Sequence, residues 1–332
     1  MDGNKKLIVS TSPHLKSGVT TQKIMLDVII ALAPAAIASV VLYAWAAVKL
    51  LLVCVAAAVG AEALFCLACR KKQTVTDLSA IVTGLILALT LPATVTVWQA
   101  IVGAVFAIIV VKCLFGGIGT NFANPAATAR VLLLLSFSTT VAGGTAANFM
   151  DAALATGATP LAVIDGATNL AAVKLPSLLD MLLGVRGGAV GEGCIAAILI
   201  GCVYLIVRGV IKWYVPASYA VTLFLVSFVR FWVLEGSAMG GAELALYQLM
   251  GGGALFCAVF MITDYVSTPI NNAGKVVFAV GAALLTCLIR FFGNYPEGAS
   301  FAILFMNILS PYIEKLCAKR PFGALKAGKE KA

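Results

Sequence analysis

The sequence predicts an all-α polytopic membrane protein with about ten transmembrane helices. Its mean hydropathy is +1.04, 61% of its 332 residues are apolar, and only 11% are charged. This apolar fraction exceeds what the core of a soluble domain can bury. The apolar residues also fall into runs of roughly 20, the length that crosses a hydrocarbon core about 30 Å thick.

The runs can be assigned in order along the chain. The third contains Pro92, and the fifth opens on Asn124 and Pro125, so we expect both helices to be bent or partly unwound. The predicted spans are 24–43, 47–69, 79–96, 98–115, 125–142, 189–208, 214–234, 243–262, 275–293 and 299–317.

Basic residues set the expected orientation of these spans. Residues 1–23 form a polar tail with no basic segment leading directly into an apolar one, so no cleaved signal peptide is expected. Most of the 23 basic residues fall in one set of connecting segments, which the positive-inside rule places in the cytoplasm. Both termini, including the basic tail 318–332, are then cytoplasmic, and the loop 143–188 lies outside an inner (cell) membrane. This distribution also explains the net charge of +9 without a nucleic-acid partner.

An internal repeat relates the first transmembrane half, 24–142, to the second, 189–317. An apolar run that begins at Val102 reaches Lys112 after ten positions, and one that begins at Val280 reaches Arg290 after ten. A polar hairpin and another apolar helix follow in both places. Because five helices per half is an odd number, a duplication would give two inverted five-helix halves.

Ionisable residues inside the spans are candidates for a functional pathway. Glu62 lies deep in the second span and is the best of them, whereas Asp27, Asp77, Asp180 and Arg290 lie near helix ends, where water or the interface can solvate them.

Four further residues have both a structural and a functional interpretation. Glu192 lies among glycines that permit close packing of a helix or a cofactor. Asn121 and Asn124 precede a helix, where they can cap it or bind an anionic or carbonyl group. Asp264 lies in a Ser- and Thr-rich turn, which is either a capped turn or a step in an ion path.

The sequence contains no complete motif for several other kinds of chemistry. The pair Cys66 and Cys69 has the spacing of metal ligands but no second pair to complete a site, so no metal is expected. The sequence has no HExxH, Walker loop or Ser–His–Asp pattern, which argues against soluble hydrolase or kinase chemistry.

The loop 143–188 contains Thr156, Gly157, Ala158 and Thr159, where small residues leave the last hydroxyl accessible to a bulky partner. As a threonine hydroxyl is a weak nucleophile, modification there would need an enzyme. A second Gly-Ala-Thr ends at Thr168, but no Ser or Thr precedes its glycine. On composition alone the loop could equally be a plain linker.

At this motif the chain resembles the RnfD/NqrB family, membrane subunits of the Rnf and sodium-pumping quinone oxidoreductase complexes, and is most similar to RnfD. The resemblance extends to TDLSAIVTGLILALTLP (76–92), GGIGTNFANPAA (116–127), GAVGEGCIAAILIGCVYLI (188–206), TDYVSTP (263–269) and YPEGASFAILFMN (295–307). Ala153 stands where the family usually has an acidic residue.

The resemblance implies a function and its cofactors. It implies FMN bound covalently to Thr159 by a phosphoester, installed by a flavin transferase of the ApbE type, and a second, non-covalent riboflavin. It also implies a fold similar to urea and ammonium channels, other Rnf-type membrane and peripheral subunits as partners, and electron transfer between ferredoxin and NAD coupled to sodium or proton translocation. The alternatives are a passive channel or small-solute transporter without a redox centre, or a subunit that only anchors redox partners.

Overall fold

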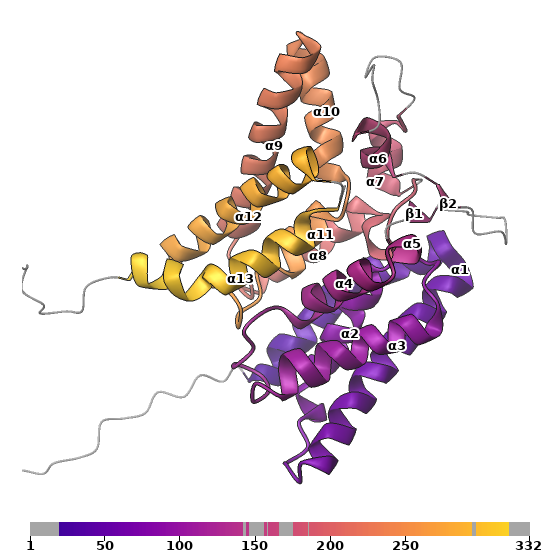
Figure 1. The fold of residues 1–332 in the computed structure, drawn as a ribbon, viewed down its shortest axis with the longest axis vertical. Helices are drawn as coiled ribbons and strands as arrows, with labels where there is room; N and C mark the ends of the chain where they lie inside the picture. Colours follow the sequence, from indigo (N-terminus) through magenta and orange to yellow (C-terminus); the bar gives the residue numbers. More distant parts are fainter. Residues whose placement is uncertain are drawn as a thin grey trace, which may run out of the picture.

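The computed structural model describes residues 20–141, 144–145, 156–157, 159–165, 175–184, 186–293 and 297–318. Helices form nearly all of its regular structure (Figure 1), as the all-α class predicts. The exception is a short antiparallel pairing of β1 (Gly144–Thr145) with β2 (Thr156–Gly157) in the loop between the halves.

The helices form two groups joined by that loop. The N-terminal group contains α1 (Thr21–Ala68), η1 (Val75–Asp77), α2 (Ser79–Thr90), α3 (Val97–Phe106), the π-helical η2 (Ala107–Cys113), α4 (Pro125–Ser136) and α5 (Ser138–Val141). The loop contains α6 (Pro160–Asp165) and α7 (Leu178–Leu183). The C-terminal group contains η4 (Val190–Glu192), α8 (Ile195–Val207), α9 (Tyr214–Glu235), α10 (Ala238–Met250), α11 (Ala254–Phe260), α12 (Asn272–Phe292) and α13 (Ala299–Leu316).

Proline positions explain two helix ends in the N-terminal group. Helix α2 ends at Thr90 because Leu91, directly before Pro92, has an extended backbone. Helix α4 begins at Pro125, whose missing N–H costs nothing in a first turn, and Asn124 caps it by accepting from the Ala126 N–H at 3.1 Å. Both interruptions were expected from the sequence.

Of two further predicted boundaries, one was confirmed and one was wrong. The spans predicted at 24–43 and 47–69 are two helices within the element α1, and they meet at a kink at Ala44, where φ is 47°. The single span predicted at 243–262 is instead two helices, α10 and α11, bent by 52°. The break falls on Gly251–Gly253, and Gly252 and Gly253 have φ values of 56° and 64°, a region that glycine adopts without strain.

The structure supports a helical membrane protein but not a specific number of spans. Among the described residues, α1, α9 and α12 are long and apolar enough to cross a membrane, and α10 with α11 would be a fourth span if the bent pair counts as one. The remaining apolar helices in this test, α2, α3 with η2, α4 and α8, have 10–17 residues. Ten spans therefore stay a prediction.

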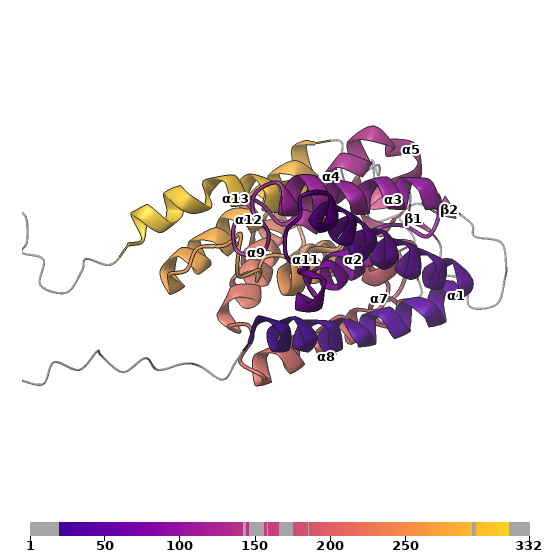
Figure 2. The same ribbon diagram turned by 90° about the horizontal axis from the view of Figure 1, so that it is seen from below.

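The two groups meet at several pairs of elements. Helix α1 packs against α8, as Figure 2 shows, α4 packs against α13, and η4 packs against both α1 and α2. Fully buried side chains from both groups, including Leu87, Ile108 and Phe256, form one continuous apolar core.

Candidate functional site

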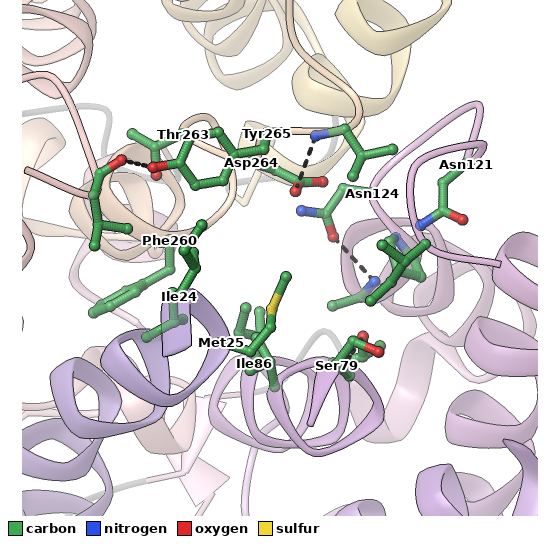
Figure 3. A pocket seen from close by; sticks show the side chains of 18 of the residues that line it. Ile24, Met25, Ser79, Ile86, Asn121, Asn124, Phe260, Thr263, Asp264 and Tyr265 are labelled. Atoms are coloured by element: carbon green, nitrogen blue, oxygen red, sulfur yellow. Dashed lines mark hydrogen bonds between the residues drawn. The ribbon is translucent and has the colours of Figure 1, made fainter. Parts of the chain in front are cut away.

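A pocket lined by residues of both helical groups lies between them and is partly open to the surroundings. Three of the residues selected from the sequence, Asn121, Asn124 and Asp264, line it together (Figure 3). Its apolar wall comes from α1, α2 and α11, with Met25, Ile86 and Phe260 among its members. The pocket thus combines a few polar groups with a mainly apolar lining, as small-molecule sites do.

The two asparagines of the pocket have different roles. Asn124 is buried and committed to its helix, because its Oδ1 accepts from the N–H groups of Ala126 and Ala127. Asn121 is not committed in this way: its Oδ1 is buried without a hydrogen-bond partner among the described residues. A buried polar atom left unpaired is costly, so Asn121 is the better candidate for a ligand contact.

Asp264 forms a capped turn between α11 and α12. Its carboxylate accepts from the Ser267 hydroxyl at 2.9 Å and from the Val266 N–H at 3.4 Å. Burial raises the pKa of Asp264, and these hydrogen bonds act in the opposite direction. Buried Asn307 of α13 connects this turn to the start of α4, since with its amide oriented to make both bonds it donates to Ser267 O at 3.2 Å and accepts from the Asn124 N–H at 3.0 Å.

Glu62 lies behind the pocket wall and is not one of the residues that line it. Its Oε1 lies 2.8 Å from Nζ of Lys112, a pocket residue, and also accepts from the Thr74 hydroxyl. Lys112 donates in turn to Ser79 Oγ at 2.6 Å. The side chains of Glu62 and Lys112 are 1% and 3% exposed, so the pair is desolvated.

Glu192 belongs to a separate charged cluster, which we define as Arg130, Arg186, Glu192, Arg290 and Glu297. Arg130 of α4 contacts the carboxylate of Glu297 and lies 3.7 Å from Glu192 Oε1, while Arg186 donates to Glu192 O at 2.8 Å. With both carboxylates ionised, the charged cluster carries one net positive charge. It connects the two groups, because Arg130 of the N-terminal group contacts Glu192 and Glu297, which lie in the C-terminal part of the chain. Arg130 also donates to Thr90 O at the end of α2.

Glycines around Glu192 permit close packing, which favours the structural interpretation of this segment. A Cβ added at Gly191 would lie 2.5 Å from Leu89 Cβ, and one at Gly253 would lie 2.2 Å from Glu192 Oε1. Glu192 thus lies in close contact with the break between α10 and α11.

Two of the residues expected to be solvated at helix ends are buried. Arg290 is 3% exposed and donates to backbone carbonyls at the break between α10 and α11. Asp27 is 7% exposed and accepts from Tyr204 OH at 3.0 Å and from Arg208 Nε at 3.2 Å. The expectation of solvation was wrong because each of these two side chains has hydrogen-bond partners that are distant in the sequence. Asp77 and Asp180 are partly exposed, as expected.

Thr159 is 6% exposed and precedes the first turn of α6. Its Oγ1 accepts from the Ala162 N–H at 3.3 Å. Thr156 and Gly157 form β2, whereas Ala158, Ala153 and Thr168 lie outside the described residues. The structure therefore does not bring Thr159 into the pocket and leaves its role in binding a flavin open to test.

Sequence reasoning missed three contributors to these sites. Lys112 served only as a mark of the internal repeat and as one of the basic residues that orient the protein, Arg130 only as one of those basic residues, and Asn307 was not selected. The available signal was a basic or amide residue inside an apolar run. Their partners, however, are distant in sequence.

These features define a helical membrane protein whose polar and charged groups gather between two helical groups, as in membrane transport proteins. The chain belongs to the NQR2, RnfD, RnfE family, whose profile matches residues 8–323.

Named relatives are similar over almost the whole chain. It is 40% identical over 328 residues to the D subunit of the Na⁺-translocating ferredoxin:NAD⁺ oxidoreductase complex of Acetobacterium woodii, covering 98% of each chain. It is 32% identical over 320 residues to the D subunit of the proton-translocating ferredoxin:NAD⁺ oxidoreductase complex of Clostridium ljungdahlii, covering 95% of this chain and 96% of the relative. It is 34% identical over 339 residues to the D subunit of the ion-translocating oxidoreductase complex of Stutzerimonas stutzeri, covering 93% and 94%.

Proposed function

We propose that this chain is the RnfD membrane subunit of an Rnf-type complex that couples electron transfer between ferredoxin and NAD to sodium or proton translocation. The observation that carries the proposal is the similarity, over 98% of both chains, to a relative named as that subunit. Its partners are then the other membrane and peripheral subunits of the complex.

We further propose that FMN is attached to Thr159 by a phosphoester that a flavin transferase of the ApbE type forms. The support is the motif Thr156–Thr159 within a family member, with its last hydroxyl at the start of a short helix. FMN, when bound, supplies one- and two-electron transfer. The chain's own part is to hold the attachment point at a fixed place against α10.

The pocket is our proposed site for the second, non-covalent flavin, riboflavin. Its lining is mainly apolar with a few polar groups, as the lining of small-molecule sites is. An isoalloxazine ring offers an imide N–H and carbonyl oxygens, which an asparagine amide can match, and the Asn121 Oδ1 is unpaired. Met25, Ile86 and Phe260 would contact the apolar part of the ring.

The finer topology is part of the same proposal. Ten spans in two inverted halves, both termini in the cytoplasm and Thr159 outside agree with the positions of the helices and with the meeting of α1 with α8 and of α4 with α13. A similar fold serves urea and ammonium channels. The passive-channel alternative predicts the same architecture without flavin.

The attachment site is tested by substitution at Thr159. The protein is co-expressed with a flavin transferase, denatured, separated on a gel and examined for flavin fluorescence under ultraviolet light. We expect Thr159→Val to abolish the fluorescence because it removes the hydroxyl, and Thr168→Val, which changes the other Gly-Ala-Thr, to leave it unchanged. Fluorescence that survives Thr159→Val would disprove the site, and a dark wild-type band would favour the channel.

The riboflavin site is tested by Asn121→Leu, which removes the unpaired amide but no helix cap. We expect the flavin extracted by acid from the purified protein to fall several-fold, while covalent flavin in the gel stays constant. Gln73→Leu, which changes an exposed amide, is the control. Unchanged extractable flavin in Asn121→Leu would remove this residue, and with it the pocket, from the proposal.

The transported ion needs a separate measurement. The first two relatives named above are described as sodium- and proton-translocating, so similarity does not select between the ions. Electron transfer in vesicles, recorded with and without sodium together with ion uptake, distinguishes them. Uptake that is unaffected by Glu62→Gln and Asp264→Asn would remove both residues from the ion path.

A further inference from the structure

The hydroxyl of Thr159 is inaccessible to an enzyme in the arrangement that the structure shows. The residue is 6% exposed, its Oγ1 accepts from the Ala162 N–H, and its carbonyl accepts from the Val163 N–H at 3.1 Å. A transferase active site has to surround the acceptor oxygen together with a bulky flavin donor. A residue that is 6% exposed does not offer its hydroxyl to such an active site.

A leucine two residues later holds Thr159 in this position. Leu161 is fully buried and fills a notch at Gly251, where an added Cβ would lie 1.8 Å from Leu161 Cδ1. One turn further, Ile164 joins a small apolar cluster with Met181, Leu244 and Tyr247. Helix α6 is therefore docked onto the end of α10 by its own side chains.

The notch belongs to a rigid platform. Arg290 fixes the end of α10, since it donates to Gln248 O at 2.5 Å and to the carbonyl oxygens of Gly251 and Gly252 at 3.1 Å each. On the loop side, Tyr247 OH donates to Pro176 O at 2.6 Å. Short elements held by few buried contacts open more readily than the core on which they rest, so exposure of Thr159 means withdrawal of Leu161.

We propose that Thr159 receives its flavin before helix α6 docks onto α10, and that insertion of Leu161 at Gly251 then closes the site to the transferase. The inference rests on the proposed attachment of FMN to Thr159.

The chemistry requires an activated donor, for which a flavin dinucleotide serves. Thr159 Oγ1 bonds to the flavin-side phosphorus, the anhydride P–O bond breaks, the nucleoside monophosphate leaves with the electron pair, and a base on the transferase takes the hydroxyl proton. No electrons are exchanged in this step.

The test measures how fast the folded, full-length chain accepts flavin. Protein made without a transferase is purified in detergent and incubated with the transferase and flavin adenine dinucleotide, and covalent flavin is followed by gel fluorescence and mass. Gly251→Ala fills the notch and leaves the motif that the transferase recognises unchanged. The φ of −91° at Gly251 is one that alanine adopts readily. Leu161→Ala empties the notch instead. Leu179→Ala on α7, where the leucine is 69% exposed, is the matched control.

We expect both notch variants to be labelled about tenfold faster than wild type or more, because the rate follows the population of the open loop. Leu179→Ala should behave as wild type. Wild type co-expressed with the transferase should carry full flavin. Purified wild type labelled as fast as Gly251→Ala and Leu161→Ala would overturn the inference and leave the attachment site standing. Absence of flavin from the co-expressed wild type would instead overturn the attachment itself.

Discussion

Glu62 and Lys112 compensate each other's charge inside the N-terminal group. The two side chains lie 2.8 Å apart and are almost completely buried. Removing one partner of such a pair leaves an uncompensated buried charge, which costs far more than replacing both. The first role of Glu62 is therefore structural, as the ion-pair partner of Lys112. An effect of Glu62→Gln on ion transport has to be separated from its effect on folding.

The two contributions can be separated by measuring stability. We expect Glu62→Gln to lower the free energy of unfolding by roughly 3–5 kcal/mol, and the double variant Glu62→Gln with Lys112→Met to recover most of that loss. Thermal unfolding in detergent gives the comparison, with ion uptake measured on the same samples. Glu62→Gln as stable as wild type would show that the pair does not form.

The role of some residues could be predicted from the sequence, and the role of others could not. Asn121, Asn124 and Asp264 could be selected because they are polar residues beside turns in an apolar chain, and the structure brings them to one pocket. Lys112 and Arg130 could not be given a role, because their partners Glu62 and Glu297 lie 50 and 167 positions away. Pairing over such distances depends on the tertiary fold.

At the scale of elements, one glycine sets the approach of α8 to α1. A Cβ added at Gly201 would lie 2.3 Å from Ala31 O, a backbone atom that cannot move away alone. Substitution would push the two first helices apart, and this contact joins the two groups.

We expect Gly201→Ala to destabilise the protein by about 1–3 kcal/mol, the usual cost of overpacking, although alanine itself favours a helix. Gly60→Ala is the control, because an added Cβ at this position in α1 meets nothing within 4 Å. The control should be neutral or slightly stabilising. The melting temperatures of both variants in detergent are the measurement, and equal values would contradict close packing of α1 on α8.

Helix boundaries were predictable where local chemistry decides them. Pro92 and the pair Asn124 and Pro125 act through their own backbone, so the end of α2 and the start of α4 follow from the sequence. The break at Gly251–Gly253 was missed because the apolar run continues through it, although three consecutive glycines are a signal. The kink at Ala44 falls between the spans predicted at 24–43 and 47–69, although no proline or glycine marks it in the sequence.

At the scale of the whole molecule, burial changes the argument for orientation. Four of the 23 basic residues from which the orientation was argued, Lys112, Arg130, Arg186 and Arg290, are each at most 7% exposed. These four lie within the fold and cannot anchor it to either side. Orientation must rest on exposed charges, of which the run Arg70–Lys72 after α1 is the clearest.

Cysteine labelling can test this orientation, because Cys69 lies beside that run. All nine cysteines lie within the described residues, and only Cys69 is exposed. On the other predicted side, Met239 at the start of α10 is 86% exposed. With a membrane-impermeant maleimide, we expect Cys69 to react in inverted vesicles and not in intact cells. In a Cys69→Ser background, Met239→Cys should react in intact cells, because an odd number of predicted spans separates the two positions.

Labelling of Cys69 in intact cells would reverse the assignment of both termini and move Thr159 to the cytoplasmic side. Labelling of both positions from one side would refute the predicted number of spans between them.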